Sequence, residues 1–363
     1  MPLSLNMPEK IARARADLRM GVAVVLKKDG VAALVLAAET LTSARLADVR
    51  AMGRAATLAI TARRAETLRA VAYDGDIARL RLPDDVDVAW ICAIADPSDD
   101  LNHPMKGPCQ TLRDGAADIH RAAIHLCKQA RLLPAALVVS TETADDLAAR
   151  HGLNLLDLDE TGALLMQSSP LRKIAAARVP LEVAEAGRLH VFRPKDGGEE
   201  HYAVEIGRPD RTKPVLTRLH SACFTGDLLG SLKCDCGPQL RAALAQIGER
   251  GEGVLLYLNQ EGRGIGLANK MRAYSLQDQG FDTVEANHRL GFEDDERDFR
   301  LGAEILTHLG FCCVQLLTNN PAKIARMQEA GLEVDRRVPL AVGKTAHNRA
   351  YLETKARKSG HLL

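Results

Sequence analysis

Three cysteines lie within fourteen consecutive residues of the sequence: Cys223, and then the pair Cys234 and Cys236. The other cysteines of the chain are scattered. Cysteine thiolates bind zinc, and a structural zinc site has four protein ligands, whereas a catalytic site keeps one position for water. Three clustered thiols therefore predict a metal site and favour an open, catalytic one.

His220 offers an alternative, because it stands three residues before Cys223 and could complete a closed structural site. A second alternative, three unrelated cysteines buried in the core, is disfavoured. Lys233 and Asp235 make the surroundings of the pair Cys234 and Cys236 polar. In an open site the metal lowers the pKa of its bound water from ~16 to ~7, which provides hydroxide at neutral pH. This spacing thus indicates a hydrolytic metal.

Three further stretches carry groups that could bind an anion or move a proton. "NQEGRGIGLANK" brings glycines that permit close approach to a ligand, with Arg263 and Lys270, but lacks a Walker A ending. "TNNPAK" puts Lys323 one turn into a helix whose start favours phosphate, although a plain capped helix fits equally well. "FEDDERDF" is by its local pattern a charged helix start. Together these groups suit hydrolysis of a phosphorylated compound.

The elements that must position these groups are clearest in the second half. The patterns predict a helix over 237–251, a buried strand over 253–259, a helix over 295–310 and a strand followed by a capped helix over 313–331. Residues 1 to about 170 alternate apolar runs ("GVAVVLKK", "VAALVLAAE", "DVAWICAIA", "PAALVVS") with the helical stretch "DIHRAAIHLCKQARLL". Residues 167–181 have the composition of a passage between domains.

We therefore predict an α/β (α+β) chain of two domains, residues 1–170 and 171–363, each a mixed sheet layered with helices. Its 363 residues are 46% hydrophobic, 26% charged and only 3% aromatic, with a net charge of +1, which disfavours nucleic acid and membrane partners. The absence of a long apolar segment and of a signal-peptide pattern predicts a cytoplasmic protein. In that reducing compartment cysteines indicate metal binding or catalysis.

The motifs "RLHSACFTGDLLGSLKCDCGPQL", "NQEGRGIGLANKMRAYSLQDQGFDTVEANHRLGF", "DERDF" and "LLTNNPAK", in this order, resemble GTP cyclohydrolase II over about residues 173–363, through the ending "KARKSGHLL". This hydrolase opens the imidazole ring of GTP in the first step of riboflavin biosynthesis. It releases formate and pyrophosphate and leaves a diaminopyrimidinone ribosylamine 5′-phosphate. The resemblance also implies a homodimer and Mg2+ on the triphosphate.

The resemblance implies one Zn2+ per chain on the three cysteines, with its water attacking C8 of guanine. Asp295 matches the proton acceptor, Tyr274 a tyrosine of the ring chemistry, and Arg297 a proposed nucleophile towards the α-phosphate. Because a guanidinium has a pKa above ~12, we interpret Arg297 as a phosphate clamp. Glu261 suits the guanine N1–H and 2-amino edge. The nucleotide-contacting positions that match are Arg218, Leu219, His220, Ser221, Ala222, Gln239, Glu261, Gly262, Arg263, Thr283, Thr318 and Lys323. Ala222 departs from the glutamate that is usual in the family, which leaves open a diverted reaction; a non-enzymatic zinc module is the other alternative.

Residues 9–165 weakly resemble 3,4-dihydroxy-2-butanone 4-phosphate synthase, which often precedes this enzyme in one chain. Its metal-binding acids are missing, since Lys27 and Lys28 occupy the expected acidic loop, and Ile119 and Arg121 align with its histidine and glutamate. His120 and His125 are nearby, but lone helical histidines are usually core or surface residues. We predict a catalytically silent domain that serves stability, dimerisation or regulation.

Overall fold

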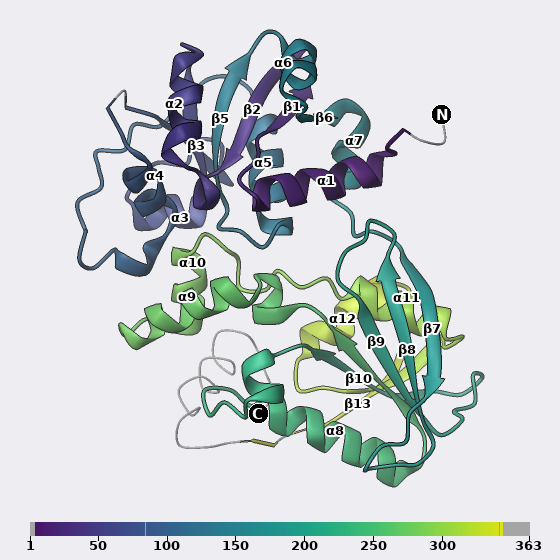
Figure 1. Cartoon of the computed structure of the whole chain (residues 1–363). Coiled ribbons are helices and arrows are strands. Elements are labelled where there is room, and N and C mark those ends of the chain that lie inside the picture. Colours follow the sequence, from purple (N-terminus) through teal and green to yellow (C-terminus); the bar gives the residue numbers. More distant parts are fainter. Residues whose placement is uncertain (1–3, 84, 341, 344–363) are drawn as a thin grey trace. The chain divides into compact units, whose positions relative to one another are not determined.

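The structure is a computed structural model that describes residues 4–83, 85–340 and 342–343. The described chain forms two compact units (Figure 1). The first contains residues 4–168 together with 268–295, and the second contains residues 169–267 together with 296–343. The segment 268–295 thus packs with the N-terminal half, although it lies far along the sequence.

The first unit is built on a six-stranded mixed sheet with the order β4-β3-β5-β2-β1-β6. Strands β1 and β6 are parallel, and the other neighbours are antiparallel. The strands are β1 (Val24–Lys28), β2 (Val31–Ala37), β3 (Ala56–Thr61), β4 (Ile77–Arg81), β5 (Ala135–Thr141) and β6 (Asn154–Asp157).

Helix α5 (Asp118–Gln129) covers this sheet because its apolar residues recur at helical spacing, with Ala123, Leu126 and Cys127 fully buried against the strands. The other helices of the unit are α1 (Met7–Arg19), η1 (Ala38–Thr40), α2 (Ser43–Ala51), α3 (Ala62–Thr67), α4 (Val88–Ala95), η2 (Pro97–Asp99), α6 (Ala144–His151), α7 (Leu158–Leu165), α9 (Leu267–Asp278) and α10 (Thr283–Arg289).

The second unit holds a seven-stranded mixed sheet with the order β13-β12-β10-β11-β9-β8-β7. Strands β13, β12, β10 and β11 run parallel to one another, and the remainder are antiparallel. The strands are β7 (Leu171–Arg178), β8 (Gly187–Pro194), β9 (His201–Ile206), β10 (Val215–Ser221), β11 (Gly253–Leu258), β12 (Cys313–Leu317) and β13 (Glu333–Val338).

Helices cover both faces of this sheet. Helix α8 (Cys236–Arg250) packs through Ala243 and Ile247 on one face. Helices α11 (Arg300–His308) and α12 (Pro321–Glu329) pack through Ile305 and Met327 on the other. The short helices η3 (Phe224–Leu228) and η4 (Glu261–Gly264) follow β10 and β11. The expected fold class, two mixed sheets layered with helices, is confirmed. Across the described ranges we find no helix with the length and apolarity needed to cross a membrane.

Most predicted elements of the second half are confirmed. Helix α8 begins with Pro238 in its first turn and ends at Gly251, whose φ of 81° closes it in the left-handed conformation. Strand β11 and the strand–helix pair β12 and α12 also lie where the patterns place them.

Two expectations were wrong, and a third was wrong in part. The run "DVAWICAIA" forms helix α4, because the Asp87 side chain caps it by accepting from the Trp90 N–H, and a short apolar run does not distinguish a strand from a buried helix. The expected passage 167–181 does contain the boundary between the two units, at residues 168 and 169, but residues 171–178 form strand β7 at the edge of the second sheet. Residues 292–299 are not a charged helix start, since α11 begins only at Arg300.

Half-buried His120 gives the first unit a pH-dependent stability. Its Nε2 lies 3.0 Å from the Thr57 hydroxyl, and its Nδ1 has no hydrogen-bond partner. Burial, and then the charge of Arg79, lower the pKa of His120 from 6.5 to about 4. In the unfolded chain, His120 therefore binds a proton as the pH falls below 6.5. In the folded chain it does so only near pH 4.

We expect this contribution to stability to be complete above pH 6.5 and to be lost as the pH falls to about 4. The total is about 3 kcal/mol. His120→Gln should flatten the free energy of unfolding over that window in urea titrations, and exposed His151→Gln is the control. An unchanged slope in His120→Gln would show that this imidazole stays charged when folded.

Candidate active site

The candidate site lies at one edge of the second sheet. Strands β10, β11 and β12 are parallel neighbours, so their carboxyl ends meet at the same edge. Cys223 follows β10, Glu261 follows β11 and Thr318 follows β12. Ligands of open α/β sheets bind at this edge, because the loops there converge.

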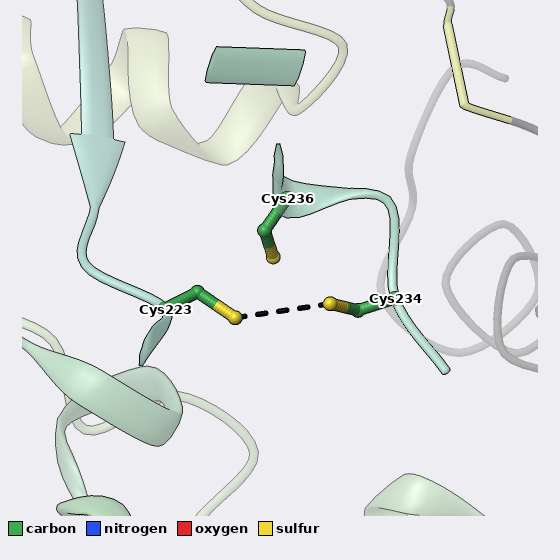
Figure 2. A group of neighbouring side chains, drawn as sticks. All are labelled: Cys223, Cys234 and Cys236. Atoms are coloured by element: carbon green, nitrogen blue, oxygen red, sulfur yellow. Dashed lines mark hydrogen bonds between the residues drawn. The ribbon is translucent and has the colours of Figure 1, made fainter. Parts of the chain in front are cut away.

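The three cysteines converge as predicted (Figure 2). Their Sγ atoms all lie within 4.8 Å of one another, and those of Cys223 and Cys234 are 3.7 Å apart. None of the three forms a disulfide. Three sulfurs bound to one tetrahedral zinc at ~2.3 Å would be ~3.8 Å apart. The cluster could therefore hold a metal ion, and its spacing suits zinc.

The local backbone is built around these sulfurs. A Cβ added to Gly226, in η3, would lie 2.7 Å from the Cys234 Sγ and 3.0 Å from the Cys223 Sγ. Without a metal, the adjacent Cys223 sulfur, then Cys234 and burial, raise the pKa of Cys236 well above its usual value. A cation reverses this cost because it favours the thiolates. Both observations fit a group bound between the sulfurs.

The Gly226 contact gives a direct prediction. Gly226→Ala should push two sulfurs apart and reduce the zinc content of the purified protein to well below one per chain, with turnover falling in parallel. The matched control is Gly162→Ala in α7, where an added Cβ meets nothing within 4 Å. Full zinc content in Gly226→Ala would show that the sulfurs do not share an ion.

Asp227 organises the loop beneath the cluster. Its carboxylate accepts from the Cys223 backbone N–H and from the Tyr257 hydroxyl, each at 3.0 Å, and lies 3.0 Å from His220 Nε2. The sequence did not identify Asp227 and Tyr257 as site residues. Asp227 is marked only by its place four residues after Cys223, and Tyr257 only by its place in the buried strand β11. Within the described ranges the metal-competent group contains the three cysteines and not His220.

His220 is not arranged as the fourth metal ligand that a closed structural site would require. Burial lowers its pKa, so the imidazole is neutral, and Nε2 serves Asp227. Its buried Nδ1 has no hydrogen-bond partner in the structure. A neutral imidazole of this kind has one free lone pair that a ligand N–H or O–H could satisfy.

Buried Arg218 and half-buried Gln239 form a polar chain beside Cys236. Arg218 donates to the Leu317 carbonyl at 2.9 Å and to Gln239 Oε1 at 2.5 Å, and the Gln239 amide donates to Asp235. Burial lowers the pKa of Arg218 to about 10, so it remains a cation at neutral pH. Its Nε has no partner. The predicted Arg218 and Gln239 are thus brought together.

A second cationic group gathers at the ends of β10 and β12. Buried Lys323 donates to the Leu219 carbonyl at 3.1 Å, and Arg297 lies 3.4 Å from the Ser221 hydroxyl. The charged groups of both side chains lie near the Phe299 ring. The centre of this ring is 4.9 Å from the Arg297 guanidinium and 5.5 Å from the Lys323 ammonium. The Thr318 hydroxyl accepts from the Asn320 N–H at the start of α12. Ala222 donates its N–H to the Leu258 carbonyl.

The glycine-rich loop after β11 holds the Arg297 segment. Gly262 and Arg263 have φ of 63° and 60°, and a left-handed non-glycine residue is a strained position typical of functional sites. The Arg263 carbonyl accepts from the Glu296 N–H at 3.0 Å, and a Cβ on Gly264 would lie 2.7 Å from the Glu296 carbonyl. Glu261 uses its two carboxylate oxygens on the N–H groups of Phe224 and Gly262.

The remaining predicted site residues belong to the first unit. Tyr274 lies on α9, Thr283 begins α10, and Asp295 is the last residue of the segment 268–295. The Lys270 ammonium lies 5.6 Å from the centre of the Tyr274 ring, and the Gln277 amide donates to the Thr283 hydroxyl at 3.3 Å.

The second unit thus defines an α/β protein with a three-cysteine cluster that could hold a metal, and with buried cations, at the carboxyl edge of its sheet. Residues 172–339 match the family model described as GTP cyclohydrolase II. The chain is 43% identical to a GTP cyclohydrolase-2 from Azospirillum brasilense over 100% of this chain and 96% of that protein. The chain belongs to the GTP cyclohydrolase II family of enzymes.

Other relatives are matched by only part of this chain. GTP cyclohydrolase-2 from Proteus mirabilis is 56% identical over 53% of this chain and 96% of its own length, and that from Azotobacter vinelandii is 54% identical over 52% and 91%. A solved two-domain 3,4-dihydroxy-2-butanone 4-phosphate synthase from A. baumannii aligns with 90% of this chain and 99% of its own at 17% identity. Its TM-score of 0.32 is too low to support a conclusion.

Proposed function

We propose that this protein hydrolyses GTP with one Zn2+ per chain, opens the imidazole ring and releases formate and pyrophosphate. The product is the diaminopyrimidinone ribosylamine 5′-phosphate of the first step of riboflavin biosynthesis. The observation that carries the proposal is the cluster of three sulfurs beside buried cations at the carboxyl edge of the sheet, in a chain of this family. The homodimer implied by the resemblance belongs to the same proposal.

Cys223, Cys234 and Cys236 would hold the zinc ion. When bound, zinc supplies Lewis acidity that makes water a nucleophile near neutral pH. Asp227 fixes the Cys223 backbone and the imidazole of His220, so the cysteine loop keeps one conformation. The free Nδ1 lone pair of His220 supports its assignment to substrate contact.

The phosphate end of GTP would meet the cations. Arg297, Lys323 and Arg218 carry positive charge close to the ends of β10 and β12, and the Thr318 hydroxyl adds a donor. Arg297 acts as a clamp on the α-phosphate, since its guanidinium stays charged at all working pH values. Mg2+ would neutralise the β- and γ-phosphates, which leave as pyrophosphate.

The guanine end would meet Glu261 and the loop of Gly262 and Arg263. Glu261 accepts from the backbone N–H groups of Phe224 and Gly262, which fix its carboxylate, and carboxylate oxygens suit the guanine N1–H and 2-amino group as acceptors. Tyr274 orients the reacting water or the formyl intermediate, Asp295 accepts a proton, and Thr283 contacts the nucleotide. Leu219, Ser221, Ala222 and Gln239 complete the set of nucleotide contacts.

The test is incubation of the full chain with GTP and Mg2+, followed by quantification of formate, pyrophosphate and the pyrimidine. We expect formate and pyrophosphate in equal amounts, and loss of both after chelation of the metal. A formylated pyrimidine without free formate would establish a diverted reaction, which Ala222 leaves as the second candidate. No consumption of GTP by zinc-loaded protein would contradict both.

We also propose that the N-terminal half catalyses nothing itself. Lys28, at the end of β1, stands where acids are needed, and its ammonium is paired with Asp159 at 3.0 Å. Arg121 is paired with Asp76 at the position expected for a glutamate. With ribulose 5-phosphate and Mg2+ we expect no dihydroxybutanone phosphate by mass spectrometry. Slow formation that depends on Mg2+ would overturn this expectation.

A further inference from the structure

The N-terminal half has a structural relation to the segment that carries Tyr274. Residues 268–295, which contain α9 and α10, pack in one unit with residues 4–168. The family model, in contrast, runs without interruption through this segment, over residues 172–339. Part of the family's catalytic region is therefore supported by the half of the chain that lies outside that model.

Arg272 makes the central contact of this packing. Its Nε donates to Asp96 at 2.9 Å, its Nη2 to Glu39 at 3.1 Å, and its Nη1 to Asn269 Oδ1 at 2.8 Å. The two ion pairs are largely withdrawn from water, with side-chain exposures of 23% for Arg272, 19% for Glu39 and 31% for Asp96. A planar guanidinium held from two directions fixes orientation as well as position.

The two carboxylates that hold Arg272 are themselves fixed. The second oxygen of Glu39 accepts from the Leu133 N–H at 2.7 Å. The second oxygen of Asp96 accepts from the Ser98 N–H at 2.9 Å and from its hydroxyl at 2.6 Å. Because these contacts hold Glu39 and Asp96 in place, a movement of α9 would break both ion pairs of Arg272. The two ion pairs therefore resist displacement of α9.

Neighbouring contacts extend this attachment along the segment. Fully buried Asn269 donates to the Arg131 carbonyl at 3.1 Å, and Gln279 donates to the Ser98 carbonyl at 2.9 Å. A Cβ on Gly291, whose φ is 87°, would lie 2.8 Å from the Thr61 hydroxyl. These contacts hold the segment from α9 to the residues after α10 against the N-terminal half.

Tyr274 lies on a different face of α9 from the attachment. At 3.6 residues per turn, Arg272 and Tyr274 are about 200° apart around the helix axis. Lys270, one turn before Tyr274, lies on the Tyr274 side with its ammonium near that ring. A rigid helix held on one face therefore sets the direction in which the tyrosine projects from the other.

We propose that the N-terminal half is a positioning element for the GTP reaction, in which Glu39 and Asp96 hold Arg272 and so fix Tyr274. The inference rests on the proposed role of Tyr274 and extends it to residues outside the family model. Arg272, Glu39 and Asp96 are positioning residues, since they act through the helix. A displacement of about 1 Å at a reacting group can reduce the rate by about 100-fold.

The test uses the full-length double variant Glu39→Gln and Asp96→Asn. Both changes keep an oxygen for the Leu133 and Ser98 donors and remove only the charges that hold Arg272. We expect kcat for GTP to fall by about tenfold to 100-fold, with a smaller change in KM. Arg54→Ala, which removes an exposed ion pair with Glu142 in the same half, is the control and should leave kcat unchanged.

A cycle with Tyr274→Phe separates positioning from general damage. If the carboxylates act through the tyrosine, they should matter little once its hydroxyl is gone, so the combined loss should be far smaller than the product of the separate losses. Losses that multiply fully, or a double variant with wild-type kcat, would overturn the proposal.

Hydrogen exchange measured by mass spectrometry tests the attachment without turnover. The backbone amides of α9 should exchange faster in the double variant than in the wild type, whereas those of α8 should not change. Equal exchange in α9 would overturn the proposal. A wild type that does not consume GTP would instead refute the proposed function, and faster exchange in α9 would still support the attachment.

Discussion

Replacing Cys234 with serine is expected to remove the bound zinc and to lower GTP turnover by at least about 100-fold. Loss of a residue that only supports a metal ligand costs up to about 100-fold in metal affinity or activity, and loss of a ligand itself should cost no less. Cys234 is 6% exposed, and its sulfur is 3.7 Å from that of Cys223. A serine hydroxyl is far less acidic than a thiol and does not replace a thiolate ligand. Zinc content by atomic absorption and initial rates of formate release measure the two effects.

The fold should survive this change, because the core of the second unit lies between its sheet and its helices and does not depend on the cluster. The control is Cys312→Ser, which alters an exposed thiol on the same unit. Two results would contradict the account. Unfolding of the second unit would indicate a structural zinc, and full activity with full zinc content would remove Cys234 from the metal site.

Arg297→Ala is expected to lower kcat/KM for GTP by about 10²–10³-fold, the usual cost of removing a donor that faces developing charge. Several contacts fix the position of Arg297. Its side chain contacts Ser221 and the Phe299 ring, and the loop after β11 fixes the backbone of the neighbouring Glu296. Arg297→Lys should recover part of the loss, because a clamp needs positive charge. Steady-state kinetics with GTP measure both variants.

The matched control is Arg300→Ala, three residues further on, whose guanidinium is 61% exposed and pairs with Asp298. It should leave kcat/KM unchanged within about twofold, as expected for an exposed ion pair. A covalent nucleotidyl adduct on Arg297, found by mass spectrometry during turnover, would contradict the clamp and establish a nucleophile. Wild-type kinetics in Arg297→Ala would exclude both roles.

The sequence supports the metal cluster and much of the second unit because the relevant signals are local. The spacing of Cys234 and Cys236 brings two sulfurs together, and the Pro238 and Gly251 signals delimit α8 within the chain itself. The third sulfur joins because β10 leads directly into Cys223. Each of these inferences needs only neighbours along the sequence.

The features that the sequence did not reveal depend on long-range packing. Asp227 gathers Tyr257 from the adjacent strand, and nothing in the linear order pairs them. Arg272 meets Glu39 across 233 positions of sequence. The run that forms α4 has apolar residues on every side, so periodicity does not separate helix from strand there.

The attachment of α9 also distinguishes this chain from shorter relatives. Since 53% of this chain covers 96% of the Proteus mirabilis protein, that protein is too short to contain both halves. The relative from Azospirillum brasilense, in contrast, matches the full length of this chain.

In the proposed site, three thiolates hold one zinc ion and leave its fourth position to solvent or substrate. X-ray absorption at the zinc edge of the full-length protein tests it most directly. We expect three sulfur neighbours and an oxygen neighbour that is replaced or perturbed when a GTP analogue binds. Four sulfurs, or three sulfurs with an imidazole nitrogen that GTP does not disturb, would contradict it.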